Sequence, residues 1–184
     1  MFGLRERTDI KTQIVFVRHG ECFGNIGSDV PEGYSYDNSP LTEKGIKMAQ
    51  RLADCFADED IAAVFSSPLI RAVQTASPIA DRLGADINIL PELVEKGTYG
   101  DEDTSALRKR AEKCIETITE NHRNGETVIV VTHGTFLSFL AREALGMNDC
   151  DSFNFEADNC SVTIVVLRDA PEKPLLRTVN NTNF

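Results

Sequence analysis

The 184-residue chain lacks the features that mark membrane, secreted and nucleic-acid-binding proteins. No apolar run is long enough for the core of a signal peptide or for a membrane span. Positive charge is in the minority, because 19 Lys and Arg residues stand against 29 Asp and Glu residues, giving a formal net charge of −10. Nucleic acids and anionic membrane surfaces bind basic patches, so we expect neither of them as a partner.

Cysteine is too sparse and too irregularly spaced for a disulfide framework or a Cys-based metal site. The five cysteines are an odd number without a C-x-x-C pair: Cys22, Cys55, Cys114, Cys150 and Cys160. Free thiols are typical of a reducing compartment, so we expect a cytoplasmic protein. Repeats, low-complexity segments and linkers are also lacking. We expect one domain over residues 1–184, with residues 1–12 as a loosely ordered, mostly polar arm.

Histidine is scarce as well, and two of the three histidines occupy equivalent positions. His19 comes soon after the apolar run 14–17, His133 comes soon after the run 127–131, and a glycine directly follows each histidine. Short apolar runs of this kind predict strands that are buried on both faces. The carboxyl ends of parallel strands share one edge of a sheet, where open α/β proteins bind their ligands. We therefore expect both imidazoles at that edge.

Strand and helix patterns alternate along the chain. Apolar residues at helical spacing predict helices over 41–56, 68–83, 104–123 and 136–145, and further strands are expected over 61–65, 87–90, 161–168 and 175–179. We predict an α/β fold, a three-layer sandwich with a mainly parallel central sheet, helices on both faces and an antiparallel edge. Thr42 and Ser67 are the expected N-caps, Ile46 is expected on an inner helix face, and Pro78 is expected to kink or interrupt its helix.

Two arginines join the histidines at the predicted edge. Arg18 directly precedes His19, and Arg71 lies in the first turn of the helix expected from residue 68, where the helix dipole favours an anion. Guanidinium groups bind tetrahedral oxyanions through paired hydrogen bonds and stay charged at any working pH. Together with His133 they predict a phosphate site. Neighbouring arginines repel a metal cation, so we expect no metal ion and no other cofactor.

The order of these motifs resembles the histidine phosphatase superfamily, in its phosphoglycerate-mutase-like branch. Arg18-His19-Gly20-Glu21 with Asn25 resembles the family signature. The segments similar to the pieces that follow it in the family are 39–45, 66–76, 131–134 and 180–182. The resemblance covers most of the chain from residue 14 onward. One departure is Cys22, which stands where the family usually has Thr or Ser.

The resemblance implies that His19 attacks phosphorus and carries the phosphoryl group as phosphohistidine until water removes it. A neutral imidazole is nucleophilic near pH 7, so this role is chemically sound. Arg18, Arg71 and a protonated His133 are expected to balance the charge of the phosphoryl oxygens, with Asn25 as a further donor. The role requires both imidazoles to meet around one phosphate and to be reachable from solvent.

The leaving alkoxide also needs a proton, and a carboxylic acid usually supplies it. The resemblance points to Glu95. Glu92 stays an alternative, because Gly100 lies one residue further from the acid than is usual in the family. The expected substrate-binding residues are Asn25, Gly20, Gly134 and Thr135, since the two glycines let backbone N–H groups approach the phosphate oxygens.

We therefore predict a phosphomonoester hydrolase that acts on a small phosphorylated metabolite. One alternative is a phosphoglycerate mutase. The resemblance disfavours it, because dedicated mutases are longer and carry insertions and a tail that shelter the phosphoenzyme from water. The other alternative is a catalytically weak phosphate-binding or regulatory module, which has no need for a free nucleophile. Nothing in the sequence indicates the oligomeric state.

Overall fold

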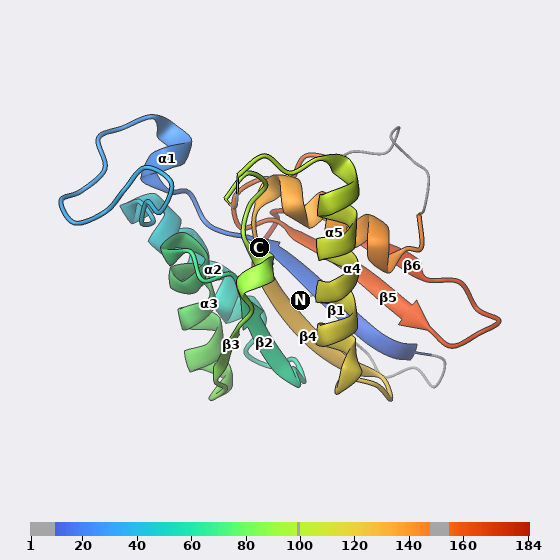
Figure 1. The fold of residues 1–184 in the computed structure, drawn as a ribbon. Helices are drawn as coiled ribbons and strands as arrows, with labels where there is room; N and C mark the ends of the chain where they lie inside the picture. The colour runs from blue at the N-terminus through green and yellow to red at the C-terminus, as the bar shows by residue number, and fades with distance from the viewer. Residues whose placement is uncertain (1–9, 99, 148–154) are drawn as a thin grey trace.

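A six-stranded sheet forms the middle of three layers in the computed structural model, which describes residues 10–98, 100–147 and 155–184 (Figure 1). The strands lie in the order β3-β2-β4-β1-β5-β6. Their bounds are β1 Ile10–Arg18, β2 Ala63–Ser66, β3 Ile87–Ile89, β4 Glu126–Thr132, β5 Val162–Arg168 and β6 Leu175–Asn181. Pairing is parallel from β3 to β1, whereas β5 is antiparallel to β1 and β6 to β5. The expected mainly parallel sheet with an antiparallel edge is confirmed.

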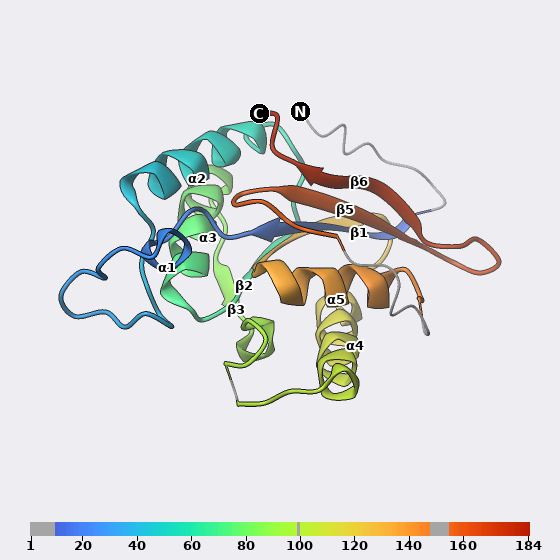
Figure 2. The same ribbon diagram turned by 90° about the horizontal axis from the view of Figure 1, so that it is seen from above.

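Helices cover both faces of the sheet (Figure 2). They are α1 Phe23–Ile26, α2 Glu43–Cys55, α3 Ile70–Leu83, α4 Thr104–Glu120 and α5 Gly134–Ala144, with a short 3₁₀ turn η1 at Pro91–Leu93. α2 and α3 pack on one face, and α4 and α5 pack on the other. The three-layer α/β architecture expected from the alternation of patterns is therefore confirmed. None of the helices in the described residues is long and apolar enough to span a bilayer.

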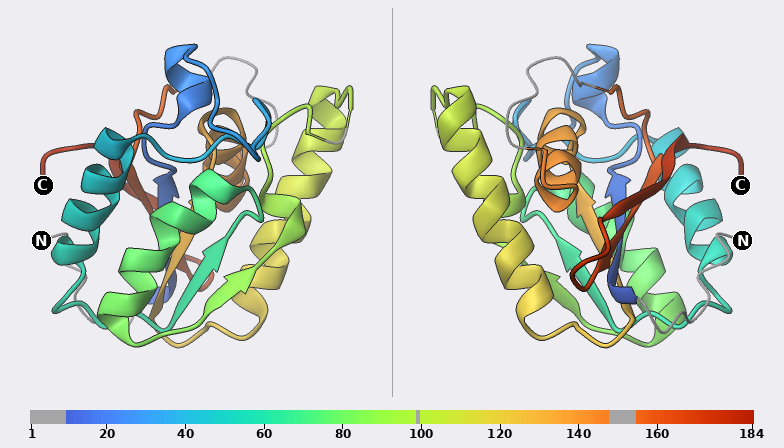
Figure 3. Two further views of the ribbon diagram at one scale, coloured as in Figure 1. Left: turned by 90° about the vertical axis from the view of Figure 1, so that its left-hand side faces the viewer. Right: turned by 90° about the vertical axis from the view of Figure 1, so that its right-hand side faces the viewer.

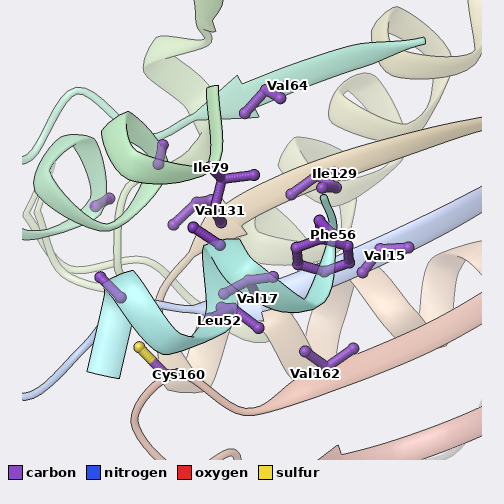
Figure 4. Close-up of a cluster of buried hydrophobic side chains, with 14 of the residues drawn as sticks. Val15, Val17, Leu52, Phe56, Val64, Ile79, Ile129, Val131, Cys160 and Val162 are labelled. Carbon is purple, nitrogen blue, oxygen red and sulfur yellow. The ribbon is translucent and has the colours of Figure 1, made fainter. Parts of the chain in front are cut away.

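The central strand β1 is buried on both faces. Val15 and Val17 belong to the core cluster under α2 and α3, which also contains Phe56 (Figure 4), whereas Ile14 and Phe16 belong to the cluster under α4 and α5. Successive side chains of a strand point to opposite faces, so an unbroken apolar run fills both cores at once. Burial on both sides holds β1 in one position between the helix layers.

The carboxyl ends of β1, β4 and β2 meet at one edge of the sheet. Their arrowheads point to the same end of the molecule, the end at which α1 lies (Figure 3). Arg18 pairs with Thr132 in register, and the His19 N–H donates to the Thr132 carbonyl at 2.9 Å. On the other side of β4, the Ser67 N–H donates to the Val131 carbonyl at 3.0 Å. The segments that follow these strands therefore start side by side.

Residues 41–45, at the start of α2, fasten this helix to the turn after His19. The Thr42 N–H donates to the Glu21 carbonyl at 2.9 Å, and Lys44 pairs with the Glu21 carboxylate at 2.6 Å. Thr42 caps α2 as expected, because its hydroxyl accepts the Gly45 N–H at 3.0 Å. A Cβ on Gly45 would lie 2.0 Å from the Glu21 carbonyl oxygen, so only glycine permits this approach.

Some local expectations are wrong. α3 begins at Ile70 with Leu69 as its N-cap, so Ser67 does not cap it, and α3 continues through Pro78 to Gly84, whose φ of 62° ends the helix. Ile46 is 43 % exposed and does not face the core. Residues 10–12 belong to β1 and not to an arm, whereas residues 1–9 and Cys150 lie outside the described residues. The other four cysteines are free thiols.

We predict that Gly45→Ala destabilises the protein. Alanine normally stabilises a helix interior relative to glycine by about 1 kcal/mol, but here the added methyl would lie 2.0 Å from the Glu21 carbonyl oxygen, so the backbone would have to shift. We expect a net loss of about 2 kcal/mol in the free energy of unfolding, measured by urea denaturation. Gln50→Ala, at an exposed position of the same helix, is the matched control with unchanged stability. If Gly45→Ala were as stable as the wild type or more stable, the space beside the Glu21 carbonyl would be large enough for a methyl group.

Candidate active site

The imidazole of His19 has one nitrogen committed to the backbone and one available for chemistry. Nδ1 lies 2.8 Å from the Gly20 carbonyl oxygen, which can only accept, so Nδ1 carries the proton of the neutral ring. Nε2 therefore has a free electron pair, and it accepts the Nε–H of Arg71 at 3.2 Å. Burial, helped by the charges of Arg71 and Arg18, lowers the pKa of His19 to about 3. The ring is thus a neutral nucleophile at physiological pH.

His133 lies beside His19, with 5.1 Å between the ring centroids. Its Nε2 is 2.8 Å from the Ser67 hydroxyl, whereas its Nδ1 is buried without a hydrogen-bond partner among the described residues. Burial, followed by the nearby His19, Arg71 and Arg18, lowers the pKa of His133 well below its ordinary value. The expectation of a protonated His133 is therefore wrong for this structure. The ring is also fully buried, so the expectation that both imidazoles reach solvent is wrong for His133.

Arg18 and Arg71 flank the nucleophile. Arg18 donates from Nη1 to the Ala157 carbonyl at 2.6 Å, while its Nε is buried without a hydrogen-bond partner in the described part of the chain. Arg71 donates from Nη1 to the Asp37 carbonyl at 2.8 Å in addition to its bond with His19. A Cβ on Gly134 would lie 3.3 Å from the Arg18 Nε, so this glycine makes room for the guanidinium group.

A cavity of about 400 Å³ opens onto this cluster. Arg18, His19 and Arg71 line it together with Asn25 and Glu95. Three of the four residues expected around the phosphate therefore line one cavity, and the fourth, His133, lies beside the His19 ring without lining the cavity. The cavity presents two guanidinium groups and a neutral imidazole to its contents, an arrangement suited to a phosphate dianion.

The two candidate acids lie in different places. Glu95 lines the cavity, and its carboxylate accepts the N–H groups of Thr135 at 3.2 Å and Phe136 at 3.0 Å, which are the first free donors of α5. Glu92 instead pairs with Lys113 at 2.5 Å and does not line the cavity. The geometry favours Glu95 as the proton donor. The N–H of Thr135, expected to bind substrate, is occupied by Glu95.

Arg110 holds the segment that carries Glu95, a function that its place in an amphipathic helix did not reveal. Its guanidinium donates to the carbonyls of Glu92 at 2.7 Å and Val94 at 2.8 Å, and it pairs with Glu102 through two hydrogen bonds of 2.7 and 2.8 Å. It also lies 3.8 Å from the centroid of the Phe136 ring. This nearly buried ion pair fixes the backbone on both sides of Leu93 next to the start of α5.

Gly20 does not present its N–H to the cavity, contrary to expectation. That N–H donates to the Thr75 hydroxyl at 3.0 Å, and Gly20 packs against the Gly45 carbonyl, from which a Cβ would be 2.9 Å away. Gly20 therefore serves close packing between the catalytic turn and α2. Thr75 is missed by sequence reasoning, because only the folded chain brings it beside a residue 55 positions away.

Asn25 lines the cavity as expected, and its side-chain oxygen is occupied. It accepts the backbone N–H of Cys22 at 3.1 Å and the side-chain N–H of Asn159 at 3.0 Å. Asn159 also donates to the His19 carbonyl at 3.0 Å and so ties the catalytic turn to the segment before β5. No pattern in the sequence marks Asn159. In the described residues, no group of three or more His, Cys, Asp or Glu side chains is placed to hold a metal ion.

Comparison with known proteins identifies relatives over most of the chain. The profile of the histidine phosphatase superfamily (branch 1) matches residues 14–101 and 95–182. A 2,3-bisphosphoglycerate-dependent phosphoglycerate mutase of Thermoplasma acidophilum is 27% identical over 175 residues, which cover 82% of this chain and 85% of that protein. An uncharacterized protein of Mycobacterium tuberculosis is 39% identical over 92 residues, and the match covers 48% of this chain but only 43% of the relative's length.

A solved structure with the same fold is a putative alpha-ribazole-5′-phosphate phosphatase from Escherichia coli. It superposes with a TM-score of 0.76 at 23% identity, and the alignment covers 93% of this chain and 97% of that chain. The order of the motifs, the strand order and the profile match agree with one another. The chain belongs to the histidine phosphatase superfamily, branch 1.

Proposed function

We propose that the protein is a phosphomonoester hydrolase with His19 as its nucleophile and without a metal ion. The observation that carries this proposal is the state of His19: a neutral ring, its proton held by the Gly20 carbonyl, and its Nε2 electron pair bonded to the Arg71 Nε–H in a cavity that Arg18 also lines. Phosphoryl transfer depends mainly on positioning and on charge balance, which these groups supply.

In the first step the phosphate oxygens of the ester accept hydrogen bonds from the N–H groups of the arginines. The Nε–H of Arg71 moves from His19 Nε2 to a phosphate oxygen, which frees the electron pair, and the unpartnered Nε of Arg18 offers a second donor. The N–P bond then forms as the P–O bond to the alcohol breaks, and Glu95, which must be in its protonated form for this step, gives its proton to the leaving oxygen and becomes a carboxylate. In the second step Glu95 accepts a proton from water, which attacks the phosphohistidine and releases phosphate.

His133 is assigned a supporting role behind the nucleophile. If the Ser67 hydroxyl donates to Nε2, the proton of the neutral ring sits on Nδ1, the atom without a partner among the described residues. His133 does not line the catalytic cavity, so we assign it an indirect role: it acts on the phosphoryl group through the His19 ring that it contacts.

Water, and not a sugar-acid hydroxyl, is the proposed acceptor of the phosphoryl group. The names of relatives include both a mutase and a phosphatase and do not decide the point. The catalytic cavity, of about 400 Å³, has room for water beside a small substrate. A bound phosphoglycerate leaves much of this space wet, so water reaches the phosphohistidine. Interconversion of phosphoglycerates without release of phosphate would instead identify a mutase.

The proposed partner is a small phosphorylated metabolite, and we expect no role for nucleic acid or membrane. We also propose a cytoplasmic location, in line with the four free thiols of the described residues. A phosphate-binding module without catalysis remains the competing class. It would be indicated by binding of vanadate or tungstate together with no turnover of any phosphomonoester.

The role of His19 predicts the behaviour of His19→Ala. Release of phosphate from a panel of phosphorylated metabolites should fall by more than the ~10²–10³-fold that follows the loss of one oxyanion donor, because no other group can hold the phosphoryl. A phosphoenzyme stable to base and labile to acid should form in the wild type and not in the variant. His122→Ala, which alters a histidine outside the cavity, and chelation with EDTA should both leave the rate unchanged. Phosphate release by His19→Ala at the wild-type rate would show that His19 is not the nucleophile.

Substrates that differ in their leaving group can show whether Glu95 or Glu92 is the proton donor. Glu95→Gln should lower kcat for alkyl phosphates by about 10²-fold or more, since an alkoxide needs a proton as it leaves. The same variant should lose much less activity on p-nitrophenyl phosphate, whose leaving group is stable without a proton. Glu92→Gln is the matched control and should leave both rates unchanged. Equal losses on both substrates in Glu95→Gln would point to a structural role at the start of α5.

Burial of His19 predicts a pH-dependent stability. Its folded-state pKa of about 3 lies below the ordinary value of 6.5, so between these values the unfolded state binds the extra proton and acid destabilises the fold. His19→Asn should therefore lose less stability between pH 6.5 and 4.5 than the wild type, by about 2 kcal/mol. The measurement is urea unfolding at both pH values. If the free energy of unfolding changed equally with pH in both proteins, the pKa of His19 would not be lowered by burial.

A further inference from the structure

A second cavity, of about 530 Å³, adjoins the catalytic one. The two cavities share Arg18, Glu95 and Lys96. One wall of the second cavity is a face of α5, because residues 134, 135, 138, 139 and 142 follow helical spacing. The facing wall is the segment 155–158 before β5. The second cavity therefore extends from the proposed proton donor along α5.

The position of Glu95 decides what enters this space. Glu95 lies at the junction of the two cavities, and its carboxylate is held at the first turn of α5. The leaving oxygen departs in line with and opposite to the attacking His19 Nε2, and it must reach Glu95 for its proton. The organic part of the substrate attached to that oxygen then extends beyond Glu95. Because Glu95 lines both cavities, the second cavity is the space that adjoins the catalytic one on this side and can receive a larger organic part.

The walls of the second cavity offer flat surfaces. Phe139 and Phe155 are half-buried side chains that both line it, and the Arg142 guanidinium lies 5.4 Å from the centroid of the Phe139 ring. Aromatic faces and guanidinium planes bind flat rings through stacking and through burial of apolar area. A short aliphatic group fills little of this space and gains little from it.

A buried hydroxyl in the same wall lacks a partner. Ser138 is 5 % exposed, and its Oγ has no hydrogen-bond partner among the described residues. Buried polar groups are almost always satisfied, so an orphan hydroxyl beside a cavity indicates a polar atom of a ligand. A ring that carries a heteroatom can meet this hydroxyl, whereas a plain hydrocarbon ring cannot.

The charges around the second cavity balance. Arg18, Lys96 and Arg142 stand against Glu95, Glu156 and Asp158 among its lining residues. A group that carried a second negative charge, such as the carboxylate of phosphoglycerate, meets as many acids as bases there. The lining therefore favours an uncharged polar group over a second anion.

We propose that the second cavity binds the alcohol part of the substrate, and that this alcohol carries a neutral heteroaromatic ring. The inference rests on the proposed hydrolase function. The substrate class is a phosphomonoester of a heteroaromatic alkyl alcohol, with the phosphate among Arg18, His19 and Arg71, the ring against Phe139 and Phe155, and a ring heteroatom bonded to Ser138.

Alkyl phosphates with leaving alcohols of similar acidity test this proposal. The esters are ethyl phosphate, 2-cyclohexylethyl phosphate, 2-phenylethyl phosphate and 2-(pyridyl)ethyl phosphate, with 3-phosphoglycerate as the anionic comparison. We expect kcat/KM to rise about 10-fold or more from ethyl to pyridylethyl phosphate, because the ring is buried and stacked. The cyclohexyl ester should fall between them, and 3-phosphoglycerate should not exceed ethyl phosphate.

Variants assign the preference to the second cavity. Phe139→Ala should reduce the ratio of kcat/KM for the pyridylethyl ester to that for ethyl phosphate to about a third of its value or less. Ser138→Ala should reduce kcat/KM for the pyridyl ester relative to the phenyl ester by about 5-fold, the effect of one hydrogen bond. Thr104→Phe narrows the cavity with a larger side chain at an exposed lining position, so it should reduce the same ratio without disturbing the core. Phe184→Ala, outside both cavities, is the matched control with an unchanged ratio.

The outcomes separate the two proposals. Hydrolysis of all esters at one kcat/KM, or a preference that survives both Phe139→Ala and Thr104→Phe, would overturn the ring site and leave the hydrolase standing. A preference for 3-phosphoglycerate over the ring esters would also overturn it. Failure of the wild type to release phosphate from any ester would overturn the proposed function itself, and the ring site with it.

Discussion

The parallel pairing of β1 with β4 is the contact on which the site depends. Arg18 lies opposite Thr132, and the backbone of His19 is bonded to that of Thr132, so the two histidine turns leave the sheet side by side. A slip of one residue would turn every side chain of β1 to the other face and separate the imidazoles. Burial of apolar side chains on both faces of the strand opposes such a slip.

Burial then sets the chemistry of the two rings. A pair of imidazoles 5.1 Å apart and next to two guanidinium groups cannot both take up protons, since each charge would lie in a poorly solvated and already positive environment. The consequence is a His19 ring that is uncharged at neutral pH. The fold loses stability as the pH falls below the ordinary pKa of histidine, because the unfolded chain then binds a proton that the buried ring does not.

The fold and the cluster of charged groups were predictable from sequence, because both arise from local patterns. Apolar runs identify the buried strands, and Arg18, His19 and Arg71 follow the ends of such runs. The state of His133 was not predictable in this way. Its burial and its contact with Ser67 depend on how β2 lies against β4 and on the segment that leaves β2.

The same limit applies to the groups that support the site. Arg110 and Asn159 each bond to a segment far away in the chain, and their own sequence neighbourhoods are those of an ordinary helix and loop. Thr75 lies in a segment that resembles the family, yet nothing in that segment indicates its bond to Gly20. Propensity and periodicity describe neighbours along the chain, whereas these residues act on neighbours in space. Ile46 illustrates the converse case, since it fits the helical period and yet lies at the edge of the buried stripe.

Signature residues and substrate-selecting surfaces occupy different parts of the molecule. Gly20, Gly45 and Thr75 belong to the segments that define the family, and they fix the backbone around the nucleophile without lining the catalytic cavity. The second cavity is formed mainly by later turns of α5 and by the segment 155–158, which the signature does not include. The motifs that resemble the superfamily therefore position the backbone around His19, whereas the second cavity is lined mainly by residues outside those motifs.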